Sequence, residues 1–308
     1  MSRQRILVTG TSGQVGGAVV RVLEGKGEVV APGRDRLDLS NAESIRAVMR
    51  EIRPRWVVNA AAHTAVDKAE SEPELAFAIN SDAPRIFGEE AKKIGAAVIH
   101  FSTDYVFDGS KASAYLETDA TEPLNVYGKT KLAGEQGLAA TGAAHFIFRT
   151  SWVYGATGKN FLLSILRMAR EREQLRIVAD QHGGPTWSLD LARLTAHAIG
   201  IVEAATAEGA SAETAAMPIS GVYHAGGAGE TTWFGFASAA VDALRRLEPA
   251  ARLATVEPIA TVEYPTPARR PANSRLNCGK LESVFGWRMM DWRDSLQQVM
   301  GELFPGAE

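Results

Sequence analysis

The sequence predicts an α/β fold in which a doubly wound parallel sheet is covered by helices on both faces. Short apolar runs alternate with longer segments of helical periodicity, a glycine-rich turn follows the first run, and five such runs precede residue 155. This alternation favours parallel strands that are joined by right-handed crossovers. The runs are largely apolar, as expected of strands that are buried on both faces.

In the first half we expect strands at residues 5–9, 28–31, 56–60, 97–101 and 145–149, and helices at residues 18–23, 43–53, 74–94 and 130–138. Gly25 closes the first helix. Ser40 and Glu43 have the spacing of a capping box that opens the second helix, and Pro54 stops it. Pro84 interrupts the third helix.

The second half predicts a smaller mixed α/β lobe, with strands at 175–178, 221–224 and 252–256 and helices at 161–172, 189–202, 233–247, 278–285 and 292–303. Residues 204–216 are small and polar and are expected to form a surface connection. We expect residues 1–155 to form the sheet domain, with part of 175–220 and 220–250 returning to it, and 156–308 to form mainly the smaller lobe. A substrate would lie in the cleft between them.

The composition excludes several classes of protein. A net charge of −3 gives no reason to expect a nucleic acid or an anionic membrane as partner. The single cysteine, Cys278, excludes an internal disulfide and fits a reducing compartment. No apolar run approaches the ~18 residues of a spanning helix, and the apolar run after the basic start at residues 1–5 is too short for a signal peptide. We therefore expect a cytoplasmic protein.

Gly10, Gly13 and Gly16 follow the first predicted strand and open the first helix. Glycines there permit a tight turn and let a pyrophosphate approach the N-terminus of the helix. A tight turn without a ligand is the alternative, but the strand–turn–helix context favours a dinucleotide site and hence a Rossmann-type sheet.

Arg34 stands after the second strand, where an NAD-preferring site has an acidic residue. Its guanidinium can pair with a 2′-phosphate, which favours NADPH as the cofactor. Asp35 and Asp38 are close enough in sequence to leave NADH open, and a solvated surface role for Arg34 is the alternative.

Polar and aromatic residues follow the next three predicted strands. The carboxyl ends of parallel strands lie at one edge of the sheet, so these residues are expected to lie near one another. We assign His63 to the cofactor pocket and not to proton transfer. The hydroxyl of Thr103 can hydrogen-bond a substrate oxygen. Asp104 either contacts the substrate as well or caps a turn. Trp152 is either a core residue or a pocket wall.

Tyr127 and Lys131 are four residues apart beside a predicted helix, so they project from the same face. An ammonium ~4 Å from a phenol, at an effective dielectric of ~20, stabilises the phenolate by ~4 kcal/mol and lowers its pKa by up to ~3 units. The tyrosine would then be an efficient acid–base catalyst near neutral pH. The alternative, if this pair is considered alone, is that both residues lie at the exposed start of a helix and have no catalytic role.

Arg269 and Arg270 lie in a segment that is stiffened by three prolines, at residues 265–271. Two neighbouring guanidinium groups on a rigid loop can grip a phosphate. A solvated basic surface is the alternative.

Gly10-x-x-Gly13-x-x-Gly16 and Tyr127-x-x-x-Lys131 resemble the motifs of extended short-chain dehydrogenase/reductases. Five longer runs are similar to the dTDP-4-dehydrorhamnose reductase family: residues 59–70, 102–107, 123–128, 148–154 and 264–271. The resemblance covers nearly the whole chain. It implies that NADPH, with NADH as the alternative, reduces the C4 keto group of dTDP-4-dehydro-L-rhamnose to give dTDP-L-rhamnose.

By this resemblance Tyr127 is the proton donor, while Lys131 lowers its pKa and holds the nicotinamide ribose. Thr103 tunes the tyrosine and contacts the sugar together with Asp104 and Trp152, and the resemblance makes Arg269 and Arg270 candidates for the nucleotide phosphates. The implied cofactor site consists of Gly10, Ser12, Gly13, Gln14, Val15, Gly16, Arg34, Asp38, Leu39, Ala62, His63, Thr64, Tyr127 and Lys131.

Some members of this family form homodimers around Mg²⁺ held by carboxylates, one of them early in the first helix. This chain has no acidic residue there before Glu24, so we assign no metal ligands and leave Mg²⁺ and a homodimer open. Two alternatives remain for the function. One is a nucleotide-sugar epimerase or dehydratase, which shares the fold and the Tyr/Lys pair. The other is a non-catalytic regulatory subunit related to the reductase.

Overall fold

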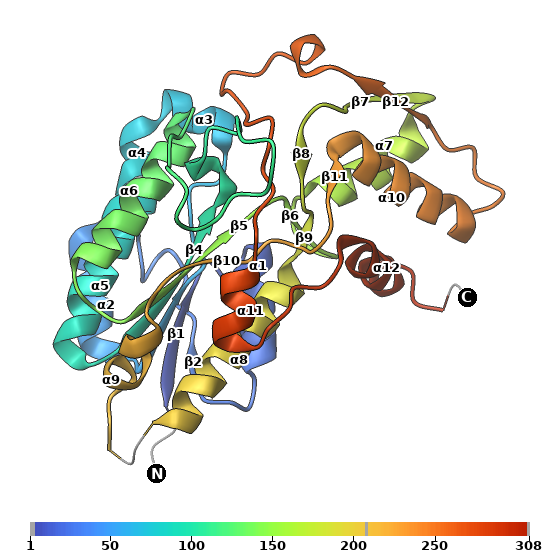
Figure 1. Ribbon diagram of the computed structural model, residues 1–308. Helices are drawn as coiled ribbons and strands as arrows, with labels where there is room; N and C mark the ends of the chain where they lie inside the picture. Colours follow the sequence, from blue (N-terminus) through green and yellow to red (C-terminus); the bar gives the residue numbers. More distant parts are fainter. Residues whose placement is uncertain (1–3, 207–208, 307–308) are drawn as a thin grey trace.

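The computed structural model describes residues 4–206 and 209–306, so part of the basic start of the chain lies outside it (Figure 1). A parallel sheet of six strands forms its centre, in the order β10-β5-β4-β3-β1-β2. The strands are β1 (Arg5–Thr9), β2 (Glu28–Val30), β3 (Trp56–Asn59), β4 (Ala97–Thr103), β5 (His145–Thr150) and β10 (Gly221–His224). The five strands predicted in the first half are confirmed, and the strand predicted at 221–224 joins them as the sixth.

Alternate residues of each strand pack against two different groups of helices. On β1, Ile6 and Val8 belong to one hydrophobic core, and Leu7 belongs to the other. The helices of the first core include α1 (Gln14–Leu23), α8 (Ser188–Ala205) and α11 (Gly279–Phe285), and those of the second are α2 (Ala42–Ile52), α5 (Ala83–Ile94) and α6 (Val126–Ala140). Figure 1 shows the sheet between the two groups. This is the predicted Rossmann-type arrangement.

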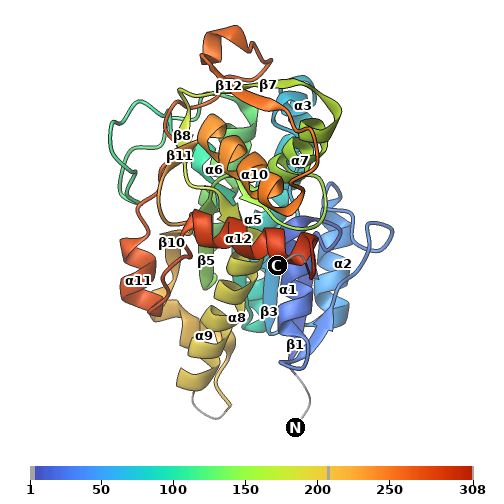
Figure 2. The ribbon, with the colours of Figure 1, turned by 90° about the vertical axis from the view of Figure 1, so that its right-hand side faces the viewer.

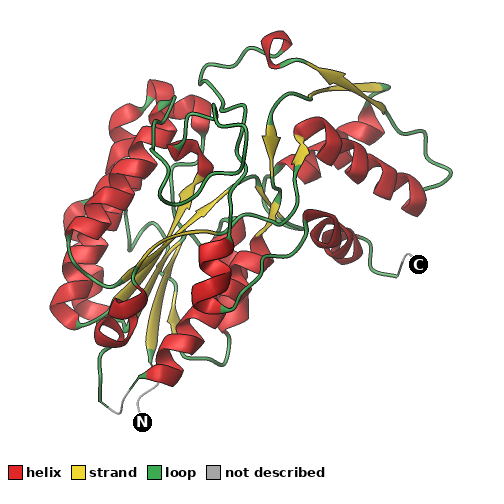
Figure 3. Cartoon of the chain, viewed as in Figure 1, coloured by secondary structure: helices red, strands yellow, loops and turns green. Residues whose placement is uncertain are grey.

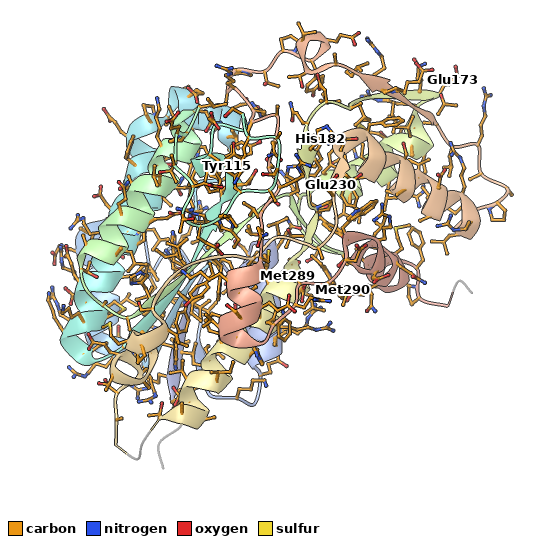
Figure 4. The ribbon with its side chains drawn as sticks, viewed as in Figure 1. Tyr115, Glu173, His182, Glu230, Met289 and Met290 are labelled. Carbon is orange, nitrogen blue, oxygen red and sulfur yellow. The ribbon has the colours of Figure 1, made fainter. Side chains whose placement is uncertain are left out.

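A smaller group of elements lies on the side of the sheet where its strands end (Figures 1 and 2). It contains the parallel pair β7 (Gln174–Val178) and β12 (Thr255–Ile259), with α7 (Phe161–Glu171), α10 (Trp233–Leu247) and α12 (Trp292–Leu303). Two short pairs lie at the junction: β6 (Val153–Tyr154) with β9 (Thr186–Trp187), and β8 (His182–Gly183) with β11 (Thr231–Thr232). Figure 3 shows how short these strands are, and Figure 4 places His182 and Glu230 beside the second pair.

Four local predictions are wrong. Asn41, not Ser40, caps α2, because its side chain accepts the N–H groups of Glu43 and Ser44. The strand predicted at 252–256 begins three residues later. The expected connection at 204–216 is partly helical, since α8 runs to Ala205 and α9 follows (Ala212–Ala216), with 207–208 outside the described residues. Finally, α6 begins at Val126 and includes Tyr127. Short 3₁₀ turns lie at Asp104–Val106, Met217–Ile219 and Thr261–Glu263.

The long helix predicted at 74–94 is broken before Pro84 and not at it. Two short helices, α3 (Val66–Ser71) and α4 (Pro73–Phe77), lead into a π-helical turn at Ala78–Asp82, and α5 follows. A π turn adds a residue to the helical repeat and is often found at functional sites. Here it turns the backbone of Asn80 toward α6, where a Cβ on Gly134 would lie 2.0 Å from the Asn80 carbonyl oxygen.

We therefore expect Gly134→Ala to lower the free energy of unfolding by roughly 3 kcal/mol, because the new methyl group forces α6 away from the π turn. Gly200→Ala is the matched control, since Gly200 also lies in a helix and a Cβ there meets nothing within 4 Å. That control should gain up to about 1 kcal/mol from helix propensity. Urea denaturation of both variants measures the difference, and equal stabilities would contradict the close approach.

Candidate active site

The predicted site residues lie at one edge of the sheet. Residues 10–16 follow β1, Arg34 follows β2, residues 62–64 follow β3, Thr103 and Asp104 stand at the end of β4, and Trp152 follows β5. Because all these strands are parallel, their carboxyl ends meet at the same edge, which is where doubly wound sheets bind ligands.

The glycine turn after β1 has the shape that a dinucleotide requires. Gly10 has a φ of +68°, and a Cβ there would lie 2.7 Å from the backbone of Ala61. A Cβ on Gly16 would lie 2.3 Å from the carbonyl oxygen of Gly10. Gly13 caps α1 without a side-chain hydrogen bond, so the first N–H groups of the helix are available to an anion. These features fit a pyrophosphate.

The remaining residues of this turn differ in exposure. Ser12 is exposed, whereas Gln14 and Val15 are partly buried. The side chain of Gln14 accepts a hydrogen bond of 3.0 Å from Asn160 Nδ2, which ties the start of α1 to the residue that caps α7.

Arg34 is exposed beyond the end of β2, and no ion pair with the described residues occupies its side chain. Asp38 nearby accepts hydrogen bonds from the backbone N–H and hydroxyl of Ser40, which lower the pKa of the carboxyl group. Leu39 packs against the second core. The guanidinium of Arg34 is thus free to meet a ligand beside a carboxylate that already has partners.

The loop after β3 is held by Asn80, which the sequence did not single out. Asn80 Oδ1 accepts the backbone N–H of His63 (2.8 Å), and its Nδ2 donates to Thr130 Oγ1 on α6 (3.0 Å). The ring of His63 lies 3.3 Å from Glu72 Oε2, and its buried Nδ1 has no partner among the described residues. A π turn has no signature in the sequence, so this anchor could not have been found there.

Tyr127 and Lys131 lie one turn apart in α6, as predicted. The Asn125 side chain caps this helix by accepting the N–H of Gly128 (2.8 Å). Lys131 is only 1% exposed, and its Nζ donates to the carbonyl oxygen of Phe101 on β4 (2.6 Å). The two residues therefore share a face of α6 that is pressed against the end of β4.

The electrostatics of this pair differ from the prediction. Burial raises the pKa of Tyr127 to about 12, and the hydroxyl of Thr103 acts in the opposite direction. Burial also lowers the pKa of Lys131 to about 8. The expected lowering of the tyrosine pKa by Lys131 is therefore wrong for the chain on its own, because burial of the phenol is the largest cause and Lys131 does not contribute to the shift.

Thr103 and Asp104 form a buried polar pair. Thr103 Oγ1 donates to Asp104 Oδ1 (3.0 Å) and accepts the N–H of Tyr105 (3.1 Å), so Thr103 is the residue that caps the following turn. The other oxygen of Asp104, Oδ2, makes no hydrogen bond in the described chain, although the Ser274 hydroxyl is near enough to lower the pKa of the carboxyl group. Burial raises the pKa of Asp104 to about 6. A buried oxygen without a partner fits a site that awaits a polar ligand.

Trp152 forms an aromatic wall together with Trp233. Its φ is +47°, an uncommon conformation for a bulky residue, and its ring stacks on Trp233 with centroids 3.7 Å apart. A Cβ on Gly183 would lie 2.6 Å from this ring, so the glycine makes room for it. Trp233 is the first residue of α10, and no local sequence pattern predicts that it lies beside Trp152.

The two arginines of segment 265–271 have different surroundings. Arg270 pairs with Asp67 of α3 through two hydrogen bonds, one of 2.7 Å, and this hydrogen bonding raises its pKa. Arg269 has an exposed side chain, and its carbonyl oxygen accepts from Asn125 (2.7 Å). The segment is therefore fixed to α3 and to the residue that caps α6, two positions before Tyr127.

Within residues 4–206 and 209–306, no group of three or more His, Cys, Asp and Glu side chains is arranged to hold a metal ion. No helix of the same residues is long and apolar enough to cross a membrane.

The raised pKa of Asp104 predicts a dependence of stability on pH. The folded protein binds this proton more tightly than the unfolded chain, so the contribution is complete below pH ~4 and is lost as the pH rises through the folded-state pKa of about 6. From pH 4 to 7, the wild type should lose about 2 kcal/mol of stability relative to Asp104→Asn. Urea denaturation at several pH values measures this difference, and a constant difference would show that the carboxyl group titrates normally.

The comparisons with known proteins identify the family of the chain. Residues 4–304 match the family model described as "RmlD substrate binding domain". A dTDP-4-dehydrorhamnose reductase of Burkholderia thailandensis is 47% identical over 291 residues, which is 94% of this chain and 95% of that protein. The crystal structure of the Clostridium acetobutylicum dTDP-4-dehydrorhamnose reductase superposes with a TM-score of 0.87 at 34% identity, covering 97% of this chain and 99% of the other.

The reductase from Bacillus anthracis, solved in complex with NADP, has a TM-score of 0.85 at 31% identity, and the match covers 98% of this chain and 100% of that one. These matches extend over both the sheet and the smaller group of elements beyond its edge. The chain therefore belongs to the RmlD substrate binding domain family, together with the dTDP-4-dehydrorhamnose reductases.

Proposed function

We propose that this chain reduces the C4 keto group of dTDP-4-dehydro-L-rhamnose with NADPH and releases dTDP-L-rhamnose. One observation carries the proposal: Tyr127, Lys131 and Thr103 come together at the end of β4, at the edge of the sheet that also carries the glycine turn. The names of the relatives support the reaction, and the NADP complex of the Bacillus anthracis relative supports the cofactor.

We propose that different residues at the sheet edge contact different parts of the cofactor. The backbone of residues 10–16 is proposed to hold the pyrophosphate, and Arg34 the 2′-phosphate. Residues 62–64 and Lys131 are proposed to line the nicotinamide end. When it is bound, NADPH supplies the hydride.

Tyr127 is proposed to donate its proton to the alkoxide that forms at C4. A pKa of about 12 keeps the phenol protonated and ready to donate at neutral pH. Lys131, with a pKa of about 8, is mostly charged at that pH. We propose that it stabilises the phenolate that remains once the substrate and the cofactor are bound. Thr103 orients the reacting oxygen, and Asp104 accepts a hydrogen bond from a hydroxyl group of the sugar. A proton from solvent must then restore Tyr127.

The substrate is proposed to lie between the sheet domain and the smaller lobe. Trp152 and Trp233 give it a flat apolar wall, and Arg269 is a candidate for the diphosphate. Arg270 already has a carboxylate partner in Asp67. We therefore propose that it fixes the conformation of segment 265–271 and stays a second candidate for contact with the diphosphate. We also propose a cytoplasmic location, in keeping with the single Cys278, whose burial raises its pKa to about 11.

We expect Tyr127→Phe to reduce turnover by at least ~100-fold, the usual size of a general acid–base contribution. The binding of NADPH, followed by its fluorescence, should change little. Tyr223→Phe is the control, because the Tyr223 hydroxyl donates to the Ile219 carbonyl oxygen, away from the sheet edge. Turnover of Tyr127→Phe at the level of this control would remove Tyr127 from the mechanism.

Arg34→Ala should raise the KM for NADPH at least ~10-fold more than the KM for NADH, because one charge-assisted contact to the 2′-phosphate is worth about 1.5–3 kcal/mol. Arg36→Ala is a matched control: Arg36 is also exposed in the same loop, but it pairs with Glu51. Equal effects of Arg34→Ala on both cofactors would end the 2′-phosphate assignment.

A nucleotide-sugar epimerase or dehydratase of this fold keeps its cofactor through the catalytic cycle, so cofactor that stays bound during purification would favour that alternative. A non-catalytic regulatory subunit would give no oxidation of NADPH with any 4-keto sugar nucleotide. The presence of Tyr127, Lys131 and Thr103 in one place favours the reductase over the regulatory subunit.

A further inference from the structure

A row of buried polar side chains crosses the sheet and ends at Lys131. Thr9, Asn59 and His100 are register neighbours on β1, β3 and β4, and each is at most 2% exposed. They lie on the face that packs against α5 and α6, where the residue two positions earlier on each strand belongs to an apolar core. Polar groups in such a place cost free energy unless they are hydrogen-bonded.

Hydrogen bonds join the row into one chain. The backbone N–H of Ala61 donates to Thr9 Oγ1 (3.1 Å), and Thr9 Oγ1 donates to Asn59 Oδ1 (2.7 Å). Asn59 Nδ2 lies 3.1 Å from His100 Nδ1, and His100 Nε2 lies 3.2 Å from Lys131 Nζ. The chain therefore runs from the backbone beside the glycine turn to the buried amine.

The direction of the chain decides which nitrogen of His100 carries its proton. An amide nitrogen only donates, so His100 Nδ1 accepts from Asn59, and the N–H of the neutral ring is on Nε2. That N–H points at Lys131 Nζ, which can accept it only as the uncharged amine. A charged Lys131 requires the reverse: a bare Nε2, an N–H on Nδ1, and an Asn59 amide group that has turned over.

We propose that His100 is a positioning residue whose tautomer is coupled to the charge of Lys131, with Asn59 and Thr9 setting the direction of the chain. The inference rests on the role proposed above for Lys131. Uptake of one proton from solvent by the Lys131 amine moves the ring N–H from Nε2 to Nδ1, and the ring itself stays neutral. The charge of Lys131 is thereby linked, through this chain of hydrogen bonds, to the backbone N–H of Ala61.

The charged and titratable neighbours allow this coupling. Burial, and then the charge of Lys131, hold the pKa of His100 well below its usual range, so the ring does not become charged itself. A backbone hydrogen bond with Asn59 opposes this shift, and His145 on β5 adds to it weakly. Lys131 is faced by His100 from β4 and by Glu135 from its own helix, and Glu135 opposes the effect of burial on the lysine pKa. Glu135 is in turn paired with Arg149 of β5 (2.6 Å).

The test is nitrogen-15 NMR of the histidine rings in the full chain between pH 6 and 10, with the His100 signals assigned from a His100→Gln variant. Labelled lysine gives the titration midpoint of Lys131 in the same samples. We expect an Nε2–H ring above that midpoint and an Nδ1–H ring below it. In Lys131→Met, which keeps Asn59 as donor, the ring should stay in the Nε2–H form at every pH.

A His100 tautomer that does not change while Lys131 titrates would overturn the inference, as would an Nδ1–H ring at high pH or a lysine that stays charged to pH 10. None of these measurements depends on turnover. A protein that shows the coupling but does not oxidise NADPH with the 4-keto sugar would leave this inference standing and remove the proposed function.

Discussion

The burial of Lys131 between α6 and β4 is the constraint on which the rest of the site depends. Its amine is held by a backbone carbonyl of β4, so α6 must lie almost in contact with the end of that strand. Gly128 makes this approach possible, since a Cβ there would lie 2.2 Å from the carbonyl oxygen of Tyr105 in the turn after β4. Gly134 allows the same helix to lie against the π turn, where a Cβ would be 2.0 Å from the Asn80 carbonyl oxygen. Tyr127 is carried to the sheet edge by the same helix.

A buried ion pair also fastens this helix to the sheet. Glu135 of α6 and Arg149 of β5 are both about 4% exposed, and the two side chains share two short hydrogen bonds, of 2.9 and 2.6 Å. Removing one partner of such a pair leaves an uncompensated charge and costs about 3–5 kcal/mol, although an apolar pair of similar volume could be equally stable. The pair is therefore better understood as a device that fixes where α6 lies than as a large source of stability.

Much of the fold could be predicted, because short apolar runs indicate buried strands and the glycine spacing indicates the turn after the first strand. The edge positions of Thr103, Asp104 and Trp152 follow from parallel strands alone. The π turn that presents Asn80, the stacking of Trp233 on Trp152, and the pairing of Arg270 with Asp67 depend on tertiary contacts between distant segments. The pKa of Tyr127 could not be predicted from spacing either, since helical spacing places two groups on one face but does not show how deeply they are buried.

The central claim is that this sheet edge delivers a hydride to a sugar carbonyl carbon while α6 supplies the proton. The most direct measurement uses NADPH that carries deuterium at the transferable position of nicotinamide C4, with the dTDP-4-keto-6-deoxy sugar as substrate. The account predicts one deuterium at C4 of the product sugar and one released oxidised cofactor for each sugar reduced. Deuterium that stays on the cofactor, or a sugar changed without net oxidation of NADPH, would contradict it.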